Sequence, residues 1–162
     1  MAPQSIPLKR NRTYGRSLAR LAAVQALFQI EFSKADGDTV MAEFLEHRFK
    51  HPHETSDVDF ADADKGHFKK VVSGVLLEMT ELNDLVRSIL PKEWPLDRLD
   101  PEVRSILRAA AFELVSTTTP SPAIIAEYVG VADAFHDADK KRFVGGALNG
   151  LVARTRPNEP EA

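Results

Sequence analysis

RSLARLAAVQALF, residues 16–28, is the stretch that decides how the chain begins to fold. Large apolar residues recur there and just beyond at spacings of three and four: Leu18, Leu21, Val24, Phe28 and Phe32. This spacing places apolar side chains along one side of an α-helix. The stretch therefore predicts an amphipathic helix from about Gly15, with Arg16 and Arg20 one turn apart toward the edge of its apolar stripe.

Outward from this stretch, the same helical spacing returns along the chain, and no run alternates between apolar and polar residues as strands do. We expect further helices at about residues 39–49, 57–80, 82–90, 100–117, 121–135 and 139–154. Asp100-Pro101 marks one start clearly, because Asp favours the N-cap and Pro favours the first helical position. The predicted fold class is all-α, a compact bundle of about seven helices.

Two residues carry specific packing predictions. Glycine in a helix interior costs up to ~1 kcal/mol relative to alanine, so Gly74 predicts the close approach of another helix. Trp94 stands in a short linker before Pro95 and is expected to insert its indole into the core.

Length and composition indicate the domain organisation. The chain has 162 residues, which suits one domain, and we expect that domain at residues 14–155. Pro3 and Pro7 favour a flexible basic arm over residues 1–13. Residues 156–162 are expected to form a disordered tail.

The sequence argues against several classes of function. It contains no Cys, which removes disulfides, thiolate nucleophiles and Cys-based metal sites. His47 and His51 lie four apart, but Pro52 disrupts that spacing, so we interpret them as a solvated helix end. No catalytic residue, metal or cofactor is predicted. No apolar run reaches the ~18 residues of a membrane helix and no secretory signal is evident, so a soluble cytoplasmic protein without membrane contact is expected.

Charge is distributed unevenly along the chain, although its formal net value is only −3. Five cations precede the first acidic residue, Glu31: Lys9, Arg10, Arg12, Arg16 and Arg20. A second basic cluster lies near the C-terminus: Lys140, Lys141 and Arg142. Nucleic-acid binding depends on local patches, and arginine in a flexible arm neutralises phosphates and stacks on unpaired bases. The pattern favours RNA binding, with a merely solvated basic tail as the alternative.

Three stretches together resemble one family. They are RSLARLAAVQALF (16–28), ILRAAAFEL (106–114) and PAIIAEYVGVADAF (122–135), the last followed by FVGGALN (143–149). Each alone is a weak helical pattern, but in this order and spacing they are similar to the NusB family of bacterial transcription antitermination factors. The resemblance covers roughly residues 14–155.

Membership of that family implies a fold of two small packed helical bundles. It also implies binding to the boxA element of nascent ribosomal RNA leader transcripts, together with the ribosomal protein NusE, within an RNA polymerase elongation complex. Some members self-associate, so a homodimer is a further partner that the resemblance implies.

The resemblance also implies roles for particular residues. The arginine-rich first helix of the family maps onto Arg16 and Arg20, and its following polar and aromatic positions map onto Gln25 and Phe28. Lys140, Lys141 and Arg142 would lie beside the basic arm and form one RNA surface with it. Phe28, Glu102 and Arg104 would contact the protein partner. For Gln25, Glu102 and Arg104, ordinary exposed helix positions are the alternative, and for Phe28 the alternative is a place mainly in the core. Arg108 and Glu113 are interpreted as forming structural ion pairs or caps.

The chain departs from the family pattern at two places. The usual I-N-E and F-V-N-G motifs each carry Asn, where this sequence has Ala126 and Gly145. Asp139 stands at an acidic family position beside the basic cluster and is expected to weaken RNA binding.

Two other functions stay open at this point. The same helical module precedes ribosomal RNA cytosine methyltransferases, but those need a Cys nucleophile and a cofactor domain, so only a detached module would fit. The other function is that of a protein-interaction or dimerisation domain with weak RNA binding, in which the basic clusters are incidental.

Overall fold

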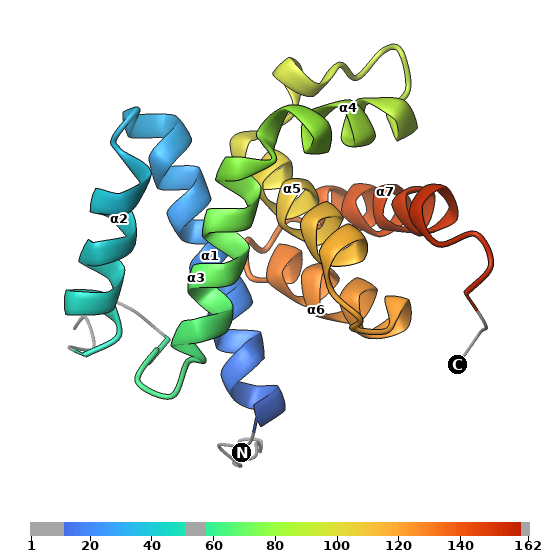
Figure 1. The fold of residues 1–162 in the computed structure, drawn as a ribbon. Coiled ribbons are helices and arrows are strands. Elements are labelled where there is room, and N and C mark those ends of the chain that lie inside the picture. Colours follow the sequence, from blue (N-terminus) through green and yellow to red (C-terminus); the bar gives the residue numbers. More distant parts are fainter. Residues whose placement is uncertain (1–11, 51–57, 160–162) are drawn as a thin grey trace.

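The structure, a computed structural model, describes residues 12–50 and 58–159. Over these residues the chain forms seven α-helices, one π-helical turn (η1) and one 3-10 turn (η2), with no strand (Figure 1). Their bounds are α1 Arg12–Ser33, α2 Gly37–Glu43, η1 Phe44–Arg48, α3 Lys65–Leu77, α4 Met79–Ile89, η2 Leu96–Arg98, α5 Pro101–Ser116, α6 Ser121–Asp133 and α7 Ala138–Thr155. In the same two ranges, no helix combines the length and hydropathy that crossing a membrane requires.

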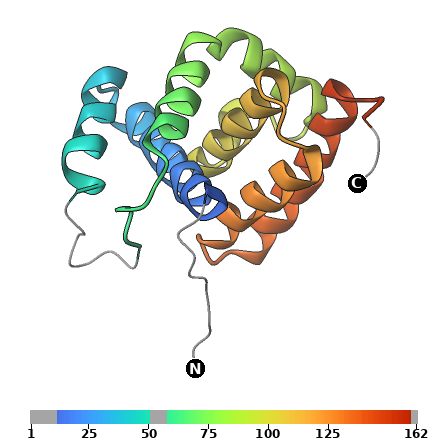
Figure 2. The same cartoon turned by 60° about the horizontal axis from the view of Figure 1, so that its bottom comes forward.

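The helices pack as two groups joined through α5. In the first group, α1 lies along α3, and α2 packs against both. In the second group, α6 and α7 form an antiparallel pair against α5, and α4 covers α5 and α7 (Figures 1 and 2). Since α5 also contacts α1 and α3, it is the central element of a common core. The predicted all-α fold of two packed sub-bundles is confirmed.

Aspartate side chains fix three helix starts. Asp36, Asp64 and Asp137 each accept a hydrogen bond from a backbone N–H in the first turn of α2, α3 and α7, respectively. These caps correct the expected boundaries: α2 begins before Thr39, and α3 begins at Lys65 rather than near residue 57. The start of α5 at Pro101 agrees with the prediction.

The packing predictions had mixed outcomes. A Cβ on Gly74 would lie 2.1 Å from Cε1 of Phe112, so only glycine lets α3 approach α5 this closely, as predicted. Trp94 is different, because 53% of its surface is exposed and it lies in the linker before η2. The expectation that its indole fills the core is wrong.

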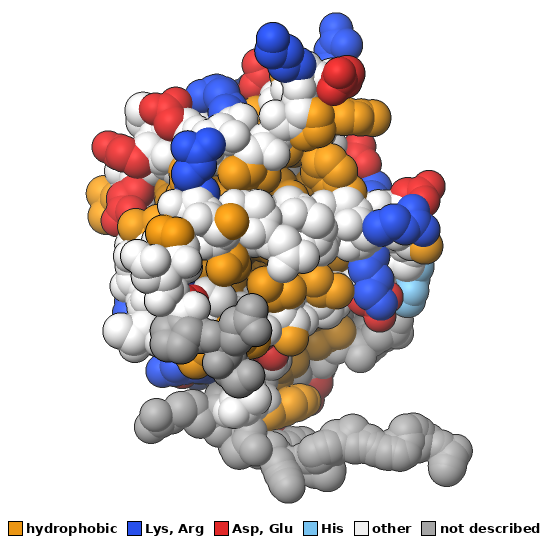
Figure 3. All heavy atoms as spheres, turned by 90° about the vertical axis from the view of Figure 1, so that its right-hand side faces the viewer, with side chains coloured by type: hydrophobic (Ala, Val, Ile, Leu, Met, Phe, Trp, Pro, Cys, Tyr) orange, Lys and Arg blue, Asp and Glu red, His pale blue; other side chains and the backbone are white. Residues whose placement is uncertain are grey.

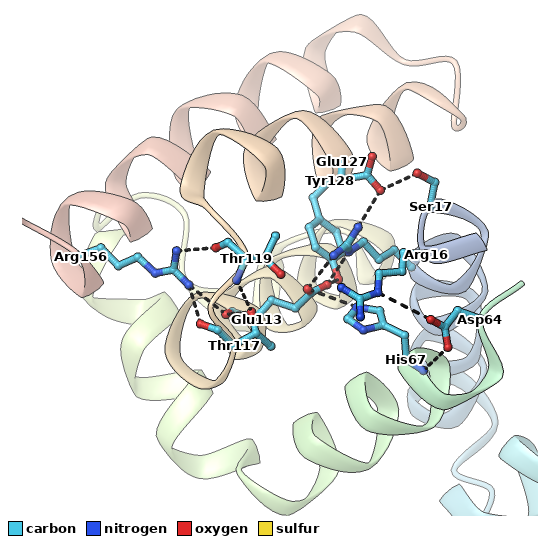
Figure 4. Close-up of polar contacts among 11 residues, drawn as sticks. Arg16, Ser17, Asp64, His67, Glu113, Thr117, Thr119, Glu127, Tyr128 and Arg156 are labelled. Carbon is cyan, nitrogen blue, oxygen red and sulfur yellow. Dashed lines mark hydrogen bonds and ion pairs between the residues drawn. The ribbon is translucent and has the colours of Figure 1, made fainter. Parts of the chain in front are cut away.

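The chain beyond α7 is held against the domain. The Arg156 guanidinium donates to backbone oxygens at the end of α5, including that of Thr117 at 2.9 Å (Figure 4). Glu159 accepts a hydrogen bond from the backbone N–H of Ser121 at 3.1 Å. Both contacts hold residues 156–159 at the α5–α6 connection. The expectation of a disordered tail is therefore wrong for these four residues.

Candidate nucleic-acid interface

Arg20 lies inside the bundle, with 4% of its surface exposed. Its Nε and Nη2 donate to the two carboxylate oxygens of Glu113 at 2.7 and 3.0 Å, and its Nη1 donates to Glu127 at 2.9 Å. Glu113 is fully buried and also accepts a hydrogen bond of 2.5 Å from the Tyr128 hydroxyl. Nε2 of His67 lies 3.3 Å from the same carboxylate (Figure 4). We call these five residues the buried network.

The buried network keeps its charges despite the lack of water. Burial alone would raise the pKa of Glu113, but the adjacent His67 imidazole and the hydrogen bonds from Arg20 outweigh burial and hold it at about 2. Burial raises the pKa of the Tyr128 hydroxyl well above its ordinary value, so it stays a hydrogen-bond donor. A guanidinium enclosed in this way has no side free for a phosphate. The prediction that Arg20 contacts RNA is therefore wrong, and the structural interpretation of Glu113 is confirmed.

Arg16 is the described arginine of the first turns that reaches solvent. Its side chain is 40% exposed, and its Nε lies 3.6 Å from Oδ2 of Asp64. A backbone hydrogen bond from His67 and the nearby Arg16 charge lower the pKa of Asp64. Arg16 thus lies at the junction of α1 with the start of α3. Among the other predicted arm residues, Lys9 and Arg10 lie outside the described residues, and only the backbone of Arg12 is described.

Arg16 and Gln25, two residues of α1 that were predicted to bind RNA, do not lie on the same side of the helix. Arg16 and Gln25 are nine residues apart, which corresponds to a rotation of about 180° around an α-helix. Arg16 accordingly pairs with Asp64 before α3, whereas Gln25 lines a groove toward α5. The two predicted RNA-binding residues Arg16 and Gln25 therefore lie on opposite sides of α1.

The second basic cluster lies on the first turns of α7, where every cation is paired. The pairs are Lys140 with Asp100 (3.2 Å) and Glu102 (3.6 Å), Lys141 with Asp133 (3.3 Å), and Arg142 with Asp139 (2.8 Å). Figure 3 shows one face of the molecule on which blue basic side chains lie beside red acidic ones. Exposed pairs of this kind contribute ~0–1 kcal/mol, so a phosphate can replace the carboxylate at little cost.

The position of this cluster, which we call the α7 cluster, is unfavourable for helix stability. Cations at a helix N-terminus face the positive end of the helix dipole. Asp137 and Asp139 offset part of this cost, because Asp137 caps α7 and Asp139 lies in its first turn. These cations therefore do little to stabilise the start of the helix.

Sequence reasoning named Asp139 beside the α7 cluster but missed its other acidic partners, Asp100, Glu102 and Asp133. Asp100 was expected to cap α5, but its side chain makes no capping hydrogen bond there. It accepts from Lys140 instead, and this hydrogen bond is the main cause that raises the pKa of Lys140. The only sequence signal was the Asp-Pro pair itself, which is typical of a helix start whatever the side chain contacts.

A shallow groove runs beside the α7 cluster. Its lining includes Gln25, Phe28 and Phe32 of α1, Glu102 of α5 and Phe135 of the α6–α7 turn. The rings of Phe28 and Phe32 stack with centroids 5.8 Å apart, and Phe32 is 76% exposed. Glu102 both lines this groove and pairs with Lys140 of the α7 cluster. We call this hollow the α1 groove.

Arg104 does not face the α1 groove. Its Nε donates to Glu31 at 3.0 Å, and its Nη1 donates to the backbone oxygens of Leu96 and Leu99. These donors stabilise the turn before α5, which gives Arg104 a structural role, and its contact with a partner stays a prediction. Arg108 donates to Asn83 and pairs with Glu31, which confirms its structural interpretation.

The two departures from the family pattern lie on facing helices. A Cβ on Gly145 of α7 would lie 4.0 Å from Cγ2 of Val129, which is less than one turn from Ala126 on α6.

The described residues contain no group of three His, Asp or Glu that could hold a metal ion. Of the histidines considered above, His47 is exposed and His51 lies outside the described ranges.

Comparison with known proteins identifies the class. Seven helices packed in two groups around α5 define a small all-helical domain over the described residues. The NusB family model matches residues 17–153, so the chain belongs to the NusB family. It is 41% identical over 154 residues to the transcription antitermination protein NusB of Gluconobacter oxydans, covering 94% of this chain and 93% of that protein. The corresponding protein of Caulobacter vibrioides is 40% identical over 147 residues, covering 90% of this chain and 97% of that protein.

Solved structures share the fold. T. maritima NusB superposes with a TM-score of 0.71 at 27% identity, covering 94% of this chain and 96% of that one. A crystal structure of the antitermination factors NusB and NusE in complex with dsRNA matches with a TM-score of 0.70 at 18% identity, covering 85% and 96%. At that identity the second comparison establishes the fold alone.

Proposed function

We propose that this chain is a non-catalytic antitermination factor that binds boxA RNA through the α7 cluster, with NusE seated in the α1 groove. The observation that carries the proposal is the α7 cluster itself. Lys140, Lys141 and Arg142 occupy a helix start where they do not favour folding, and their carboxylate partners are exchangeable. Relatives named as antitermination proteins, and the fold shared with a NusB–NusE–dsRNA complex, support the same conclusion.

RNA binding would proceed by exchange of anions. Phosphates of the transcript replace Asp100, Asp133 and Asp139 beside the three cations, and counterions released from the RNA supply the driving force. Arg16 and the basic residues before it would extend the contact along the RNA. Gln25 would add a polar contact at the rim of the α1 groove.

The α1 groove supplies a seat for the protein partner. Phe28 and Phe32 offer a stacked aromatic surface, which suits the centre of a protein interface, and the charged residues of the lining are Arg48 and Glu102. Glu102 provides an acidic rim on which a basic residue of NusE can pair. The assembled complex would then join RNA polymerase during elongation, in the cytoplasm.

The test is a titration of fluorescein-labelled boxA RNA, followed by anisotropy, with the chain alone and with added NusE. We expect binding that weakens steeply with salt and tightens when NusE is present. A Phe32→Asp variant should lose only the NusE effect, while an exposed control, Lys70→Gln on α3, should behave as wild type. An RNA affinity that does not change with salt concentration, or that does not change when NusE is added, would contradict the proposal.

A further inference from the structure

A second hollow lies between the linker before α5 and the start of α7, and Lys140 is part of its lining. It measures about 370 Å³, within the size range of small-ligand sites. Its lining includes two aromatic rings, two cations and two carboxylates: Trp94, Phe143, Arg98, Lys140, Asp100 and Asp139. Lys140 of the α7 cluster and its partner Asp100 therefore also line this hollow.

Trp94 is the unusual member of this hollow. Its indole is 53% exposed, although it is the only tryptophan of the chain and could bury more apolar surface than most side chains. Its ring centroid lies 6.5 Å from that of Phe143, with the planes tilted by 57°. The two rings thus form an open aromatic corner. Aromatic faces of this kind stack unpaired nucleobases with little dependence on sequence.

The charges on the rim fit a nucleotide better than an apolar peptide. Arg98 and Lys140 supply cations on which the phosphates flanking one nucleotide can bind. Asp100 and Asp139 are acceptors, and a carboxylate accepts hydrogen bonds from the exocyclic amino group of a base. An aromatic corner with both kinds of charge therefore matches a base that carries an amino group, joined to two phosphates.

We propose that Trp94 and Phe143 form a seat for one unpaired base of the bound RNA, with a preference for a base carrying an exocyclic amino group. This inference rests on the proposed RNA-binding function and adds a site to it. The path of the RNA would run from the phosphates on Lys141 and Arg142 across Lys140 to the base on Trp94. The seat gives the chain a base contact in addition to its phosphate contacts.

The single tryptophan makes the seat directly observable. Wild-type chain is titrated with boxA RNA while Trp94 emission is recorded under excitation that only tryptophan absorbs, and anisotropy of labelled RNA reports binding in parallel. A base stacked on the indole quenches its emission in step with the anisotropy change. Acrylamide quenching of Trp94 should fall once the RNA is bound, because the base covers the exposed ring.

Affinity measurements give a second readout. Trp94→Ala is expected to weaken RNA binding about tenfold, in the range of base–aromatic stacking, and Trp94→Phe to retain most of the affinity. An RNA with one abasic nucleotide, moved along boxA, should lose about tenfold at a single position on wild type and nothing further on Trp94→Ala. Circular dichroism controls for folding, which exposed Trp94 should not disturb.

The outcomes separate this seat from the function on which it rests. RNA that binds by anisotropy but leaves Trp94 emission unchanged, or that binds Trp94→Ala as tightly as wild type, overturns the seat and leaves the proposed function intact. The seat is also overturned if the abasic position that weakens binding most on wild type weakens binding to Trp94→Ala by the same factor. RNA that does not bind at all overturns the proposed function and the seat together.

Discussion

The buried network and the α7 cluster both pair basic side chains with carboxylates, but they differ in their access to water. Arg20 and Glu113 are enclosed, and each satisfies the hydrogen bonds of the other. Lys141 and Arg142 are exposed, and their partners also face solvent. Because a buried charge cannot lose its partner without a large penalty and an exposed one can, the first region holds the fold and the second is free to exchange ligands.

The largest effect should come from breaking the buried network. Arg20→Ala leaves the Glu113 carboxylate without its main cation in the core, which costs about 3–5 kcal/mol in the free energy of unfolding. Urea denaturation followed by circular dichroism measures the change. Arg16→Ala is the matched control, since its pair with Asp64 is partly exposed and should contribute ~1 kcal/mol or less. Equal losses from the two variants would contradict the distinction.

Acid should destabilise the protein through Glu113. Its pKa is about 2 in the folded protein against an ordinary value of 4.5, so the ionised form is favoured by folding. The resulting stability, about 3 kcal/mol, is fully present above pH 4.5 and is lost as the pH falls from 4.5 toward 2. Urea midpoints measured across this range should drop accordingly. In Glu113→Gln the drop should be smaller, and an identical profile would show that other carboxylates cause it.

Glu102 tests whether the α7 cluster and the α1 groove are coupled. Glu102→Gln removes one of the two carboxylates near Lys140, so RNA affinity of the free chain should rise about threefold. The same change should weaken NusE binding, because the groove loses its acidic rim. Glu81→Gln, at an exposed position of α4, serves as the control. A variant in which RNA and NusE affinities move in the same direction would argue against a shared residue.

The smallest effect concerns stability at the α7 cluster. Replacing Lys140, Lys141 and Arg142 together by Gln removes exposed pairs and also relieves cations at the positive end of a helix. These contributions oppose each other, so the free energy of unfolding should change by no more than about 1 kcal/mol. Urea denaturation checks this value. A loss comparable to that of Arg20→Ala would mean that the cluster is structural as well.

The helical fold could be predicted from sequence because it depends on local patterns. Apolar spacing located α1, and Asp100-Pro101 located α5. The start of α3 was placed too early, because acidic residues near 57 and at Asp64 look equally suitable as caps, and only tertiary packing selects Asp64. Trp94 was placed wrongly for a related reason. The large apolar side chain of a tryptophan favours burial, but the position of its linker depends on tertiary packing, which leaves the indole exposed.

The site was less predictable, because the role of a cation depends on residues far away in the sequence. Arg20 and Arg16 look alike in the first helix, yet Arg20 meets Glu113, which lies 93 residues further along the chain. One signal was present: Glu113 interrupts the apolar run ILRAAAFEL, and a charge in such a run requires a buried partner. Nothing in the sequence revealed that Asp100 would bind Lys140 instead of capping its own helix.

The most direct test of the division between fixed and exchangeable pairs is the salt dependence of boxA RNA affinity. It should be compared between wild type and the variant in which Lys140, Lys141 and Arg142 are all Gln. Three phosphate contacts on a single strand account for about 2 units of slope in a plot of log affinity against log salt concentration. We predict that the variant loses about this much slope while keeping its fold. An unchanged slope would contradict RNA binding at the α7 cluster.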